Sequence, residues 1–395
     1  MDMQAWQTSL SPFMDHILAF RHALHMEPEV SGQEFETKQR IILELTQLGL
    51  EIKEIDGCCS VMGTLRNGEG PCVAIRADMD ALPIREDTGL PFASRRDGVM
   101  HACGHDVHMA LALGSAIWLS THREQWRGTV KWLFESEEET VGGGQRMVAQ
   151  GCMRDPEVRC IIGQHMNPQY PTGTFYSRCG CVSGYSDELH MVVRGKQCHG
   201  AYPQRGTDAI VIAAQIVTAL QTLVSRTLSP FEPAVVTIGS IHGGSACNVV
   251  CGEVQLTGTM RSLTPETREH LRRHVCDTAR GIARSMGGEA DVQILDGYTA
   301  VNNDPRFYPV VEEIARELVG ADRIAEQPAP SLGVESFCFF LKDTPGVYYD
   351  LGCGVGSGIH TPTFRVDEAI IPIGIALQCE SVMAILKMTQ GETDA

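Results

Sequence analysis

Apolar residues recur along the chain with two spacings, and these spacings predict its secondary structure. Spacings of three and four, with Gly49 as a stop signal, predict that the first ~55 residues are helical. Short apolar runs bounded by Gly and Pro lie at 61–65, 73–77, 130–134 and 160–163, with helical stretches at 107–121 and 143–150 between them. Strands that alternate with helices predict an α/β layer fold with a largely parallel sheet.

The pattern changes near residue 186. It predicts, in order, a strand at 187–194, a helix at 208–226, strands at 234–241 and 253–261, a helix at 265–286 and a strand at 290–295. This βαββαβ order is that of a ferredoxin-like α+β unit. Helix (308–319), strand (347–351) and helix (369–387) then follow. We therefore predict two domains: a mostly parallel-sheet α/β catalytic domain in two parts, 1–185 and 297–395, interrupted by a ferredoxin-like satellite domain at 186–296.

Composition and charge narrow the class of protein. A length of 395 residues favours more than one domain, and 49 acidic against 32 basic residues give a net charge of −17, which argues against nucleic-acid binding. The first residues lack the pattern of a secretory signal, and no run of about 18 apolar residues predicts a membrane span. Fifteen cysteines, an odd number, indicate reduced thiols, so we expect a cytoplasmic protein.

Five segments place metal-capable side chains beside turn residues. In the first, Asp78 and Asp80 follow an apolar strand, at the edge where open α/β sheets bind their ligands. A solvated turn explains this pair equally well. The second segment, 101–108, is the densest, with His101, Cys103, His105, Asp106 and His108. A single buried His or Cys is usually structural, but the glycine between Cys103 and His105 lets both face one point, so the cluster favours a metal site.

The third segment is an acidic run, Glu135, Glu137, Glu138 and Glu139, between an apolar strand and three glycines. Mutual repulsion there would be costly without a cation, although an acidic surface patch stays open. Adjacent glutamates can divide the work, one binding metal and one accepting a proton from water. The fourth and fifth segments carry His165 after a strand and His360 after a glycine-rich loop, and they complete a set of ligands.

Taken in order, these motifs resemble the aminoacylase, hippurate hydrolase and auxin-conjugate hydrolase branch of the dinuclear metallo-amidohydrolases, the carboxypeptidase G-like peptidase family M20. The resemblance covers nearly the whole chain. Its motifs include Arg-Ala-Asp-Met-Asp-Ala-Leu-Pro at 76–83, His-Ala-Cys-Gly-His-Asp at 101–106, His-Gly-Ala-Tyr-Pro at 199–203 and His-Thr-Pro-Thr-Phe at 360–364. The element at 101–106 is the most specific of these.

The resemblance implies two divalent metal ions, Mn²⁺ first, with Zn²⁺, Co²⁺ or Ni²⁺ as alternatives. The implied ligands are Cys103, His105, Glu139, His165 and His360. Glu138 matches the general base, which takes a proton from water and delivers it to the departing amine. Asp80 matches the residue that supports the site by fixing the orientation of a ligand.

The resemblance also implies roles for three residues of the satellite domain. His199 and Asn248 would stabilise the oxyanion, often in the active site of a partner subunit, and Arg261 would hold a substrate carboxylate. An ordinary ion pair or a dimer contact explains Arg261 equally well. The expected partners are a small amide substrate and a second copy of the chain, in a homodimer.

The chain departs from the family pattern in two places. The usual Phe-Gln-Pro-Ala-Glu-Glu is Phe134-Glu-Ser-Glu-Glu-Glu, and the usual Glu-Asp-Phe is Glu335-Ser336-Phe337. The leading hypothesis is a metal-dependent hydrolase of small N-acyl or aroyl amino acids. The altered acidic loop motivates an alternative, the deamination of an aromatic amine at the same site. A catalytically silent metal-binding sensor is a third possibility, from a different class.

Overall fold

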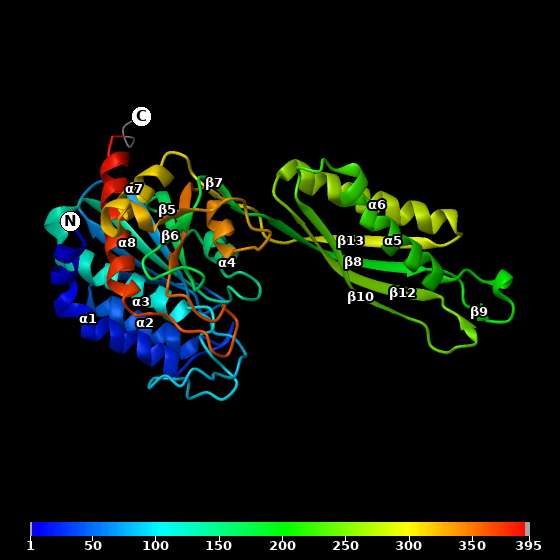
Figure 1. Ribbon diagram of the computed structural model, residues 1–395, viewed down its shortest axis with the longest axis horizontal. Helices are drawn as coiled ribbons and strands as arrows, with labels where there is room; N and C mark the ends of the chain where they lie inside the picture. Colours follow the sequence, from blue (N-terminus) through cyan, green and yellow to red (C-terminus); the bar gives the residue numbers. More distant parts are fainter. Residues whose placement is uncertain (1, 392–395) are drawn as a thin grey trace. The chain divides into compact units, whose positions relative to one another are not determined.

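The computed structural model describes residues 2–391, which form two compact units, each with its own hydrophobic core (Figure 1). The first unit contains the residues up to Val182, Val301–Ala329 and the residues from Ser336 on, and the second contains Ser183–Ala300 and Pro330–Glu335. The short return to the second unit is held by a β-bridge between Ser183 and Ser331. The sequence of Pro330–Glu335 has no repeating apolar pattern that would predict this return.

An eight-stranded mixed sheet forms the centre of the first unit. Its order is β1 (Glu51–Glu54), β2 (Val61–Asn67), β4 (Gly128–Glu135), β3 (Cys72–Asp78), β5 (Val158–Asn167), β16 (Gly346–Gly352), β6 (Phe175–Ser177) and β15 (Ile324–Glu326). Strands β4, β3, β5 and β16 run parallel to one another. Strand β2 pairs antiparallel with both β1 and β4, and β6 pairs antiparallel with β16. The predicted α/β fold with a large, parallel-rich sheet is confirmed.

Strand β1 corrects the expectation that the first ~55 residues are entirely helical. Its sequence, Glu-Ile-Lys-Glu, holds one apolar residue, which is too few to show an alternating pattern. Its backbone pairs antiparallel with β2, from Glu51 opposite Thr64 to Glu54 opposite Val61. The hydrogen bonds of the neighbouring strand therefore decide its structure.

Helix α3 (His105–Thr121) is the central helix of the first unit. It is buried from His105 to Leu119 and contacts α1, α8 and β3, which agrees with its apolar character on all sides. This burial fixes the start of the helix, where His105 lies. The other elements of this unit are α1 (Met3–Met26), α2 (Phe35–Gln47), η1 (Arg123–Gln125), α4 (Gly144–Ala149), β7 (Gly180–Ser183), β14 (Val301–Asn303), α7 (Tyr308–Val319), η3 (Ala321–Arg323), η4 (Ser336–Lys342) and α8 (Ile370–Thr389).

The second unit has the predicted βαββαβ order. Its elements are β8 (Tyr185–Arg194), α5 (Ala209–Thr227), β10 (Ala234–Gly243), β12 (Glu253–Ser262), α6 (Pro265–Ser285) and β13 (Glu289–Asp296). The antiparallel sheet has the order β10-β12-β8-β13, and both helices lie on one face of it (Figure 1). This is the ferredoxin-like arrangement. A separate pair, β9 (Cys198–His199) and β11 (Val249–Val250), and the short η2 (Pro203–Arg205) complete the unit.

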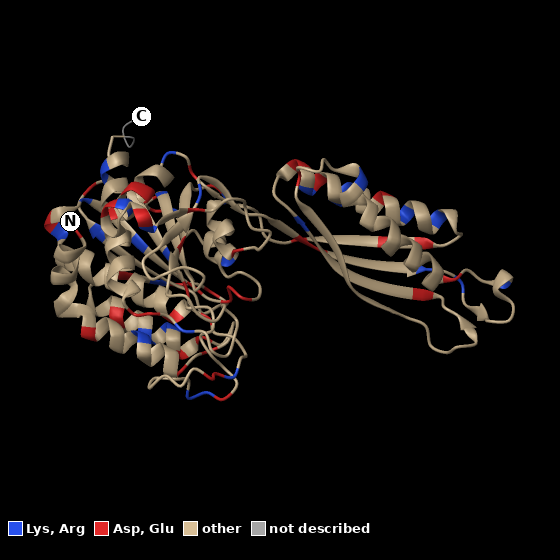
Figure 2. Cartoon of the chain, in the orientation of Figure 1, with Lys and Arg blue, Asp and Glu red and all other residues tan. Residues whose placement is uncertain are grey.

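Helices α5 and α8 are long and apolar enough, by length and composition alone, to cross a membrane. In the structure, α5 packs Ile212, Ile216 and Leu220 into the core of the second unit, and α8 packs against α3 and α7 in the first. Core helices pass the same test, so the two candidates are weak support for a membrane span. Acidic and basic residues are interspersed along both units (Figure 2).

Candidate active site

The predicted site residues of the first unit gather beyond the carboxyl ends of three neighbouring parallel strands. Asp78 and Glu135 are the last residues of β3 and β4 and lie opposite each other in register. His165 lies near the end of β5, which pairs with β3 on the other side. This is the edge at which open α/β sheets bind ligands.

The Cys103 thiol lies between two histidines that are distant in sequence. Its Sγ is 3.2 Å from His165 Nε2 and 3.3 Å from His360 Nε2. Burial by itself raises the pKa of this thiol, but the facing His165 and His105 rings outweigh that effect and lower it to about 6. Gly104 makes the approach possible, because it has a φ of 92° and a Cβ there would lie 3.0 Å from Met166. Cys103 is therefore placed to act as a thiolate at neutral pH.

Backbone carbonyls orient two of the histidines. His105 Nδ1 donates to the main-chain oxygen of Asp80 at 2.9 Å, and His165 Nδ1 donates to that of Met166 at 2.9 Å. Each ring therefore presents Nε2 to the site, as metal-binding histidines do. The Nε2 atom of His105 is buried without a hydrogen bond to any described residue and lies 3.9 Å from Glu139 Oε1.

Asp80 holds the backbone of Glu139 in place. Its Oδ2 accepts hydrogen bonds from the Glu139 N–H at 3.0 Å and from Ser31 Oγ at 2.6 Å. The Glu139 side chain then reaches His360, with Oε1 3.1 Å from Nε2. Asp80 thus supports two of the predicted ligands, since its carbonyl also orients His105.

The donor set fits divalent cations. Four groups have ligand atoms within 4.8 Å of one another: Cys103, His105 and His165; Cys103, Glu139 and His360; His105, Glu138 and Glu139; and Asp78, His105 and His108. Burial lowers the pKa of His165, but the Cys103 thiolate outweighs this and raises it to about 10. Hydrogen bonds to Cys103 and Glu139 raise the pKa of His360 to about 10. Protonated His165 and His360 thus balance the negative charges of Cys103 and Glu139. Divalent cations bound at this place would supply the same positive charge.

Two histidines of the predicted cluster differ from the others, since His108 is in one of the four groups but has both ring nitrogens hydrogen-bonded, and His101 is in none. His108 uses both ring nitrogens, because Nδ1 donates to Asp78 Oδ1 at 2.6 Å and Nε2 accepts from the Met166 N–H at 3.0 Å. Burial lowers its pKa to about 4, so it is a neutral anchor between strands β3 and β5. His101 is also buried with a pKa of about 4, and it is in none of the four groups.

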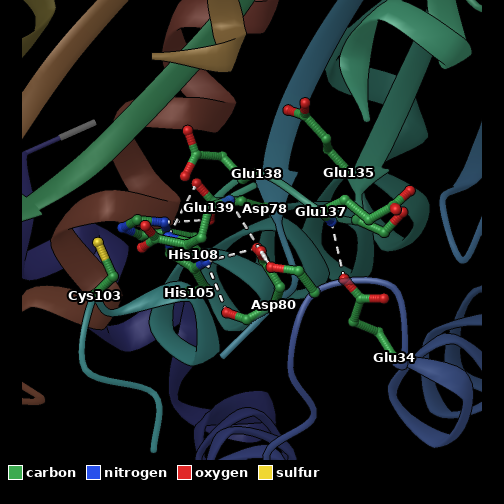
Figure 3. A network of polar contacts seen from close by, with 12 residues as sticks. Glu34, Asp78, Asp80, Cys103, His105, His108, Glu135, Glu137, Glu138 and Glu139 are labelled. Carbon is green, nitrogen blue, oxygen red and sulfur yellow. Dashed lines mark hydrogen bonds and ion pairs between the residues drawn. The ribbon is translucent and has the colours of Figure 1, made fainter. Parts of the chain in front are cut away.

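The acidic run divides into residues that face the site and residues that face away from it (Figure 3). Glu135 Oε2 lies 2.6 Å from Arg76 Nε, and Glu137 Oε2 lies 2.7 Å from Arg146 Nη1. The expectation that the whole run needs cations is therefore wrong for these two, because arginines neutralise them. Glu138 stays with the site, where its Oε1 accepts from the Ser336 N–H at 3.3 Å.

Arg76 and Glu34 also contribute to the site, although neither is among the residues predicted from the sequence. Arg76 contacts one residue in each of the two places where the chain departs from the family pattern, Glu135 and Ser336. The signal for Arg76 was an arginine inside a buried strand, since a buried charge needs partners. Glu34 accepts a hydrogen bond from the Glu137 N–H at 2.9 Å (Figure 3), and no local sequence signal predicts this contact.

The three predicted substrate-binding residues lie in the second unit, at two separate places. His199 in β9 and Asn248 lie side by side, since the Gly200 N–H donates to the Asn248 carbonyl at 2.7 Å. Arg261 is next to last in β12, and burial lowers its pKa. Strand β12 separates the two places, because His199 and Asn248 lie beyond its start and Arg261 lies near its end. From Glu253 to Arg261 the strand spans about 26 Å at ~3.3 Å per residue, so His199 and Arg261 of one chain do not meet at one small molecule.

Comparisons with known proteins agree over nearly the whole chain. A model of peptidase family M20/M25/M40 matches residues 74–384. An N-acetylcysteine deacetylase of Bacillus subtilis is 33% identical, over 95% of this chain and 98% of its own length. The IAA-amino acid hydrolase ILR1-like 2 of Arabidopsis thaliana is 33% identical, over 98% and 90%. The solved YXEP protein of Bacillus subtilis, described as a dinuclear metal-binding peptidase from the M20 family, has a TM-score of 0.83 and 31% identity, over 95% and 99%.

Proposed function

The chain belongs to peptidase family M20/M25/M40 and is a hydrolase of C–N amide bonds, and we propose that its substrate is a small N-acyl or aroyl amino acid. The resemblance to the amidohydrolase branch is thereby confirmed. Support for the substrate class comes from relatives named for N-acetylcysteine and for IAA-amino acids, both of which join an acyl group to an amino acid through an amide.

One arrangement carries the proposal. The thiol of Cys103, the rings of His165 and His360 and the carboxylate of Glu139 converge, although they come from separate segments of the chain. Carboxylate oxygens of Glu138 and Glu139 lie within 4.8 Å of His105 Nε2 or Nδ1 and of each other. A set of ligands with a second carboxylate beside it suits hydrolysis, because that carboxylate is available for proton transfer.

The proposed mechanism assigns a role to each of these groups. Cys103, His105, Glu139, His165 and His360 would hold two divalent cations, and these would supply a Lewis acid for the scissile carbonyl and lower the pKa of water. Glu138 accepts the proton of the attacking water and delivers it to the nitrogen of the departing amine. The Ser336 N–H orients Glu138 Oε1 for this transfer. Asp80 keeps His105 and Glu139 in place.

The proposal also covers the native metal, the substrate-binding residues and the oligomeric state. We propose Mn²⁺ as the native metal, with Zn²⁺, Co²⁺ or Ni²⁺ as alternatives, because a mixed thiolate, imidazole and carboxylate set accepts all four. His199 and Asn248 bind the oxyanion and Arg261 binds the substrate carboxylate. Because His199 and Arg261 lie at separate places in the second unit, the proposal includes a homodimer in which partner subunits share substrate binding. The proposed compartment is the cytoplasm.

The test combines metal analysis with a substrate screen. Purified protein is analysed for metal, treated with chelator and reloaded with each of the four ions, and N-acetylcysteine, other N-acyl amino acids and N-benzoylglycine are offered. Released amine and released ammonia are both measured. The expected result is an amino acid plus a free acid, with activity lost on chelation and restored by metal.

Glu138→Gln is the matched variant for the mechanism. It keeps the size and the polar contact to Ser336 but cannot accept a proton, so it is expected to keep its metal and lose turnover. Full activity of Glu138→Gln would overturn the assigned base. A metal content below one ion per chain that added metal cannot raise would overturn the metal-dependent reaction, and ammonia as the product would establish deamination instead.

A further inference from the structure

Arg76 is a fully buried arginine with a partner on each side of its guanidinium. Nε contacts Glu135 Oε2 at 2.6 Å, Nη1 contacts Asp78 Oδ2 at 2.7 Å, and Nη2 donates to Ser336 Oγ at 2.7 Å. The side chains of Arg76, Asp78 and Glu135 are 0% exposed. A planar guanidinium with fixed donors holds three groups in one geometry, which a lysine could not reproduce.

Two of these partners, Glu135 and Ser336, hold the segment that carries Glu138. Glu135 lies three residues before Glu138, and its other oxygen, Oε1, accepts from the Gly144 N–H at 2.5 Å. One carboxylate therefore ties both ends of the loop 136–143 together. The third partner, Ser336, contacts Glu138 directly, because its backbone N–H donates to Glu138 Oε1 at 3.3 Å while its hydroxyl is held by Arg76.

The remaining partner connects Arg76 to the strand of His165. Asp78 accepts from His108 Nδ1 through its second oxygen at 2.6 Å, and His108 Nε2 accepts from the backbone N–H of Met166 at 3.0 Å. A single guanidinium is thus linked by short contacts to the Glu138 carboxylate on one side and to the residue after His165 on the other.

We propose that Arg76 is a positioning residue for catalysis: by holding Glu135 and Ser336 it sets the place and direction of the Glu138 carboxylate. The inference rests on the proposed function, because it takes Glu138 as the base. The neutral partner of Arg76 is the one that contacts Glu138, and the balancing carboxylate, Glu135, faces away from the site (Figure 3). Arg76 therefore holds the base without adding a second negative charge beside it.

The first measurement is turnover of Glu135→Gln on N-acetylcysteine, or on the compound of the screen that the protein hydrolyses fastest. A glutamine offers one acceptor oxygen, so it cannot serve both Arg76 Nε and the Gly144 N–H. A small displacement of a reacting group costs up to about 100-fold in rate, so kcat is expected to fall by about 10- to 100-fold. KM and metal content should stay within about twofold of the wild type, because ligands and substrate contacts are unchanged.

The decisive measurement asks whether kcat recovers when the carboxylate lost in Glu135→Gln is supplied at position 336, on the other side of Arg76. Ser336→Asp alone adds a charge beside Glu138 and should also lower kcat. The double variant Glu135→Gln/Ser336→Asp gives Arg76 its second carboxylate back and should exceed the kcat of Glu135→Gln by about fivefold or more. A double variant no faster than Glu135→Gln would overturn the proposal, as would Glu135→Gln with unchanged kcat.

Lys131→Met is the control for a purely structural role. Lys131 is a buried cation on β4, the strand of Glu135, and donates to the carbonyls of Cys152, Arg154 and Pro156. Its loss should lower Tm and leave kcat unchanged, and a kcat loss as large as that of Glu135→Gln would count against a specific role of Arg76. If Glu135→Gln does not fold, Ser336→Ala removes only the hydroxyl contact and must lower kcat. An inactive Glu138→Gln with a failed rescue refutes Arg76 alone, whereas an active Glu138→Gln refutes the proposed base.

Discussion

The carboxylate of Asp80 accepts a hydrogen bond from the backbone N–H of Glu139 at 3.0 Å, although the two residues lie 59 positions apart in the chain. This contact crosses from the end of β3 to the loop after β4. It acts on the backbone of Glu139, so it sets where the side chain starts and which way it points. The adjacent Glu138 is carried by the same stretch of backbone.

Replacement of Asp80 by alanine is therefore expected to weaken metal binding. The variant loses the bond to Glu139 and keeps every predicted ligand, and loss of such an outer contact lowers metal affinity or activity by about 10- to 100-fold. Competition with a metal-binding dye measures the affinity. Asp97→Ala removes an exposed carboxylate and is the control, with no expected change. An unchanged affinity of Asp80→Ala would refute the supporting role.

Regular patterns made most of the fold predictable. The predicted strand at 73–77 matches β3 (Cys72–Asp78) because a fully buried strand leaves a continuous apolar run, and the helix at 308–319 matches α7 (Tyr308–Val319) because burial of one face leaves a repeating period. Strand β1 left no such period, and its structure depends on pairing with β2. Short elements of this kind are determined by their neighbours rather than by their own residues.

The candidate site was predictable in residue types but not in all of its contacts. Cys103 and His105 stand close together in a dense motif, which local reasoning can read. The pairing of Arg76 with Glu135 depends on the register of β3 against β4, and that with Ser336 spans 260 residues. Contacts across such distances leave no local signal, so the acidic run appeared to need more positive charge from cations than it does.

Cys103→Ser is expected to reduce metal binding sharply. The pKa of the Cys103 thiol is lowered to about 6, so at neutral pH it binds as a thiolate, whereas a serine hydroxyl stays protonated. Protein loaded with Co²⁺ should show a thiolate-to-cobalt charge-transfer band in the near ultraviolet, and Cys103→Ser should lack it. Cys379→Ser, at a buried cysteine in the core, is the control and should keep the band. A band that persists in Cys103→Ser would exclude Cys103 as a ligand.

A buried histidine should make stability depend on pH. His25 Nδ1 lies 2.9 Å from Asp106 and Nε2 lies 3.3 Å from Glu86. Burial lowers its pKa, but the pairing with Asp106 outweighs this and raises it from 6.5 to about 9. A raised pKa means that the folded state holds the proton more tightly, so the stabilisation is complete below pH 6.5 and lost as the pH rises through about 9.

The size of this effect is on the order of 3 kcal/mol. Urea unfolding compares the wild type with His25→Gln below pH 6.5 and above pH 9, and the difference between them should shrink as the pH rises. His16→Gln in the same helix is the control, because His16 pairs with Glu44 at the surface, where such pairs contribute little. A difference that does not change with pH would show that the pKa of His25 is the same in the folded and unfolded states, which would refute the raised pKa.

A buried carboxyl beneath the acidic loop should instead be a source of instability. Glu34 is 0% exposed, and burial raises its pKa from 4.5 to about 7. Between pH 4.5 and 7 the unfolded state loses this proton while the folded state keeps it, so stability falls as the pH rises over that interval. Glu34→Gln removes this cost and keeps an oxygen that can accept from the Glu137 N–H.

Chelator-treated Glu34→Gln is therefore expected to be more stable than the wild type at about pH 8, by up to about 3 kcal/mol, and little different at about pH 5. Unfolding by urea at the two pH values measures both. Glu36→Gln is the matched control, because this exposed neighbour loses its charge without leaving a buried site. If Glu34→Gln is less stable than the wild type at pH 8, the ionised carboxylate itself stabilises the loop, and the raised pKa of Glu34 is refuted.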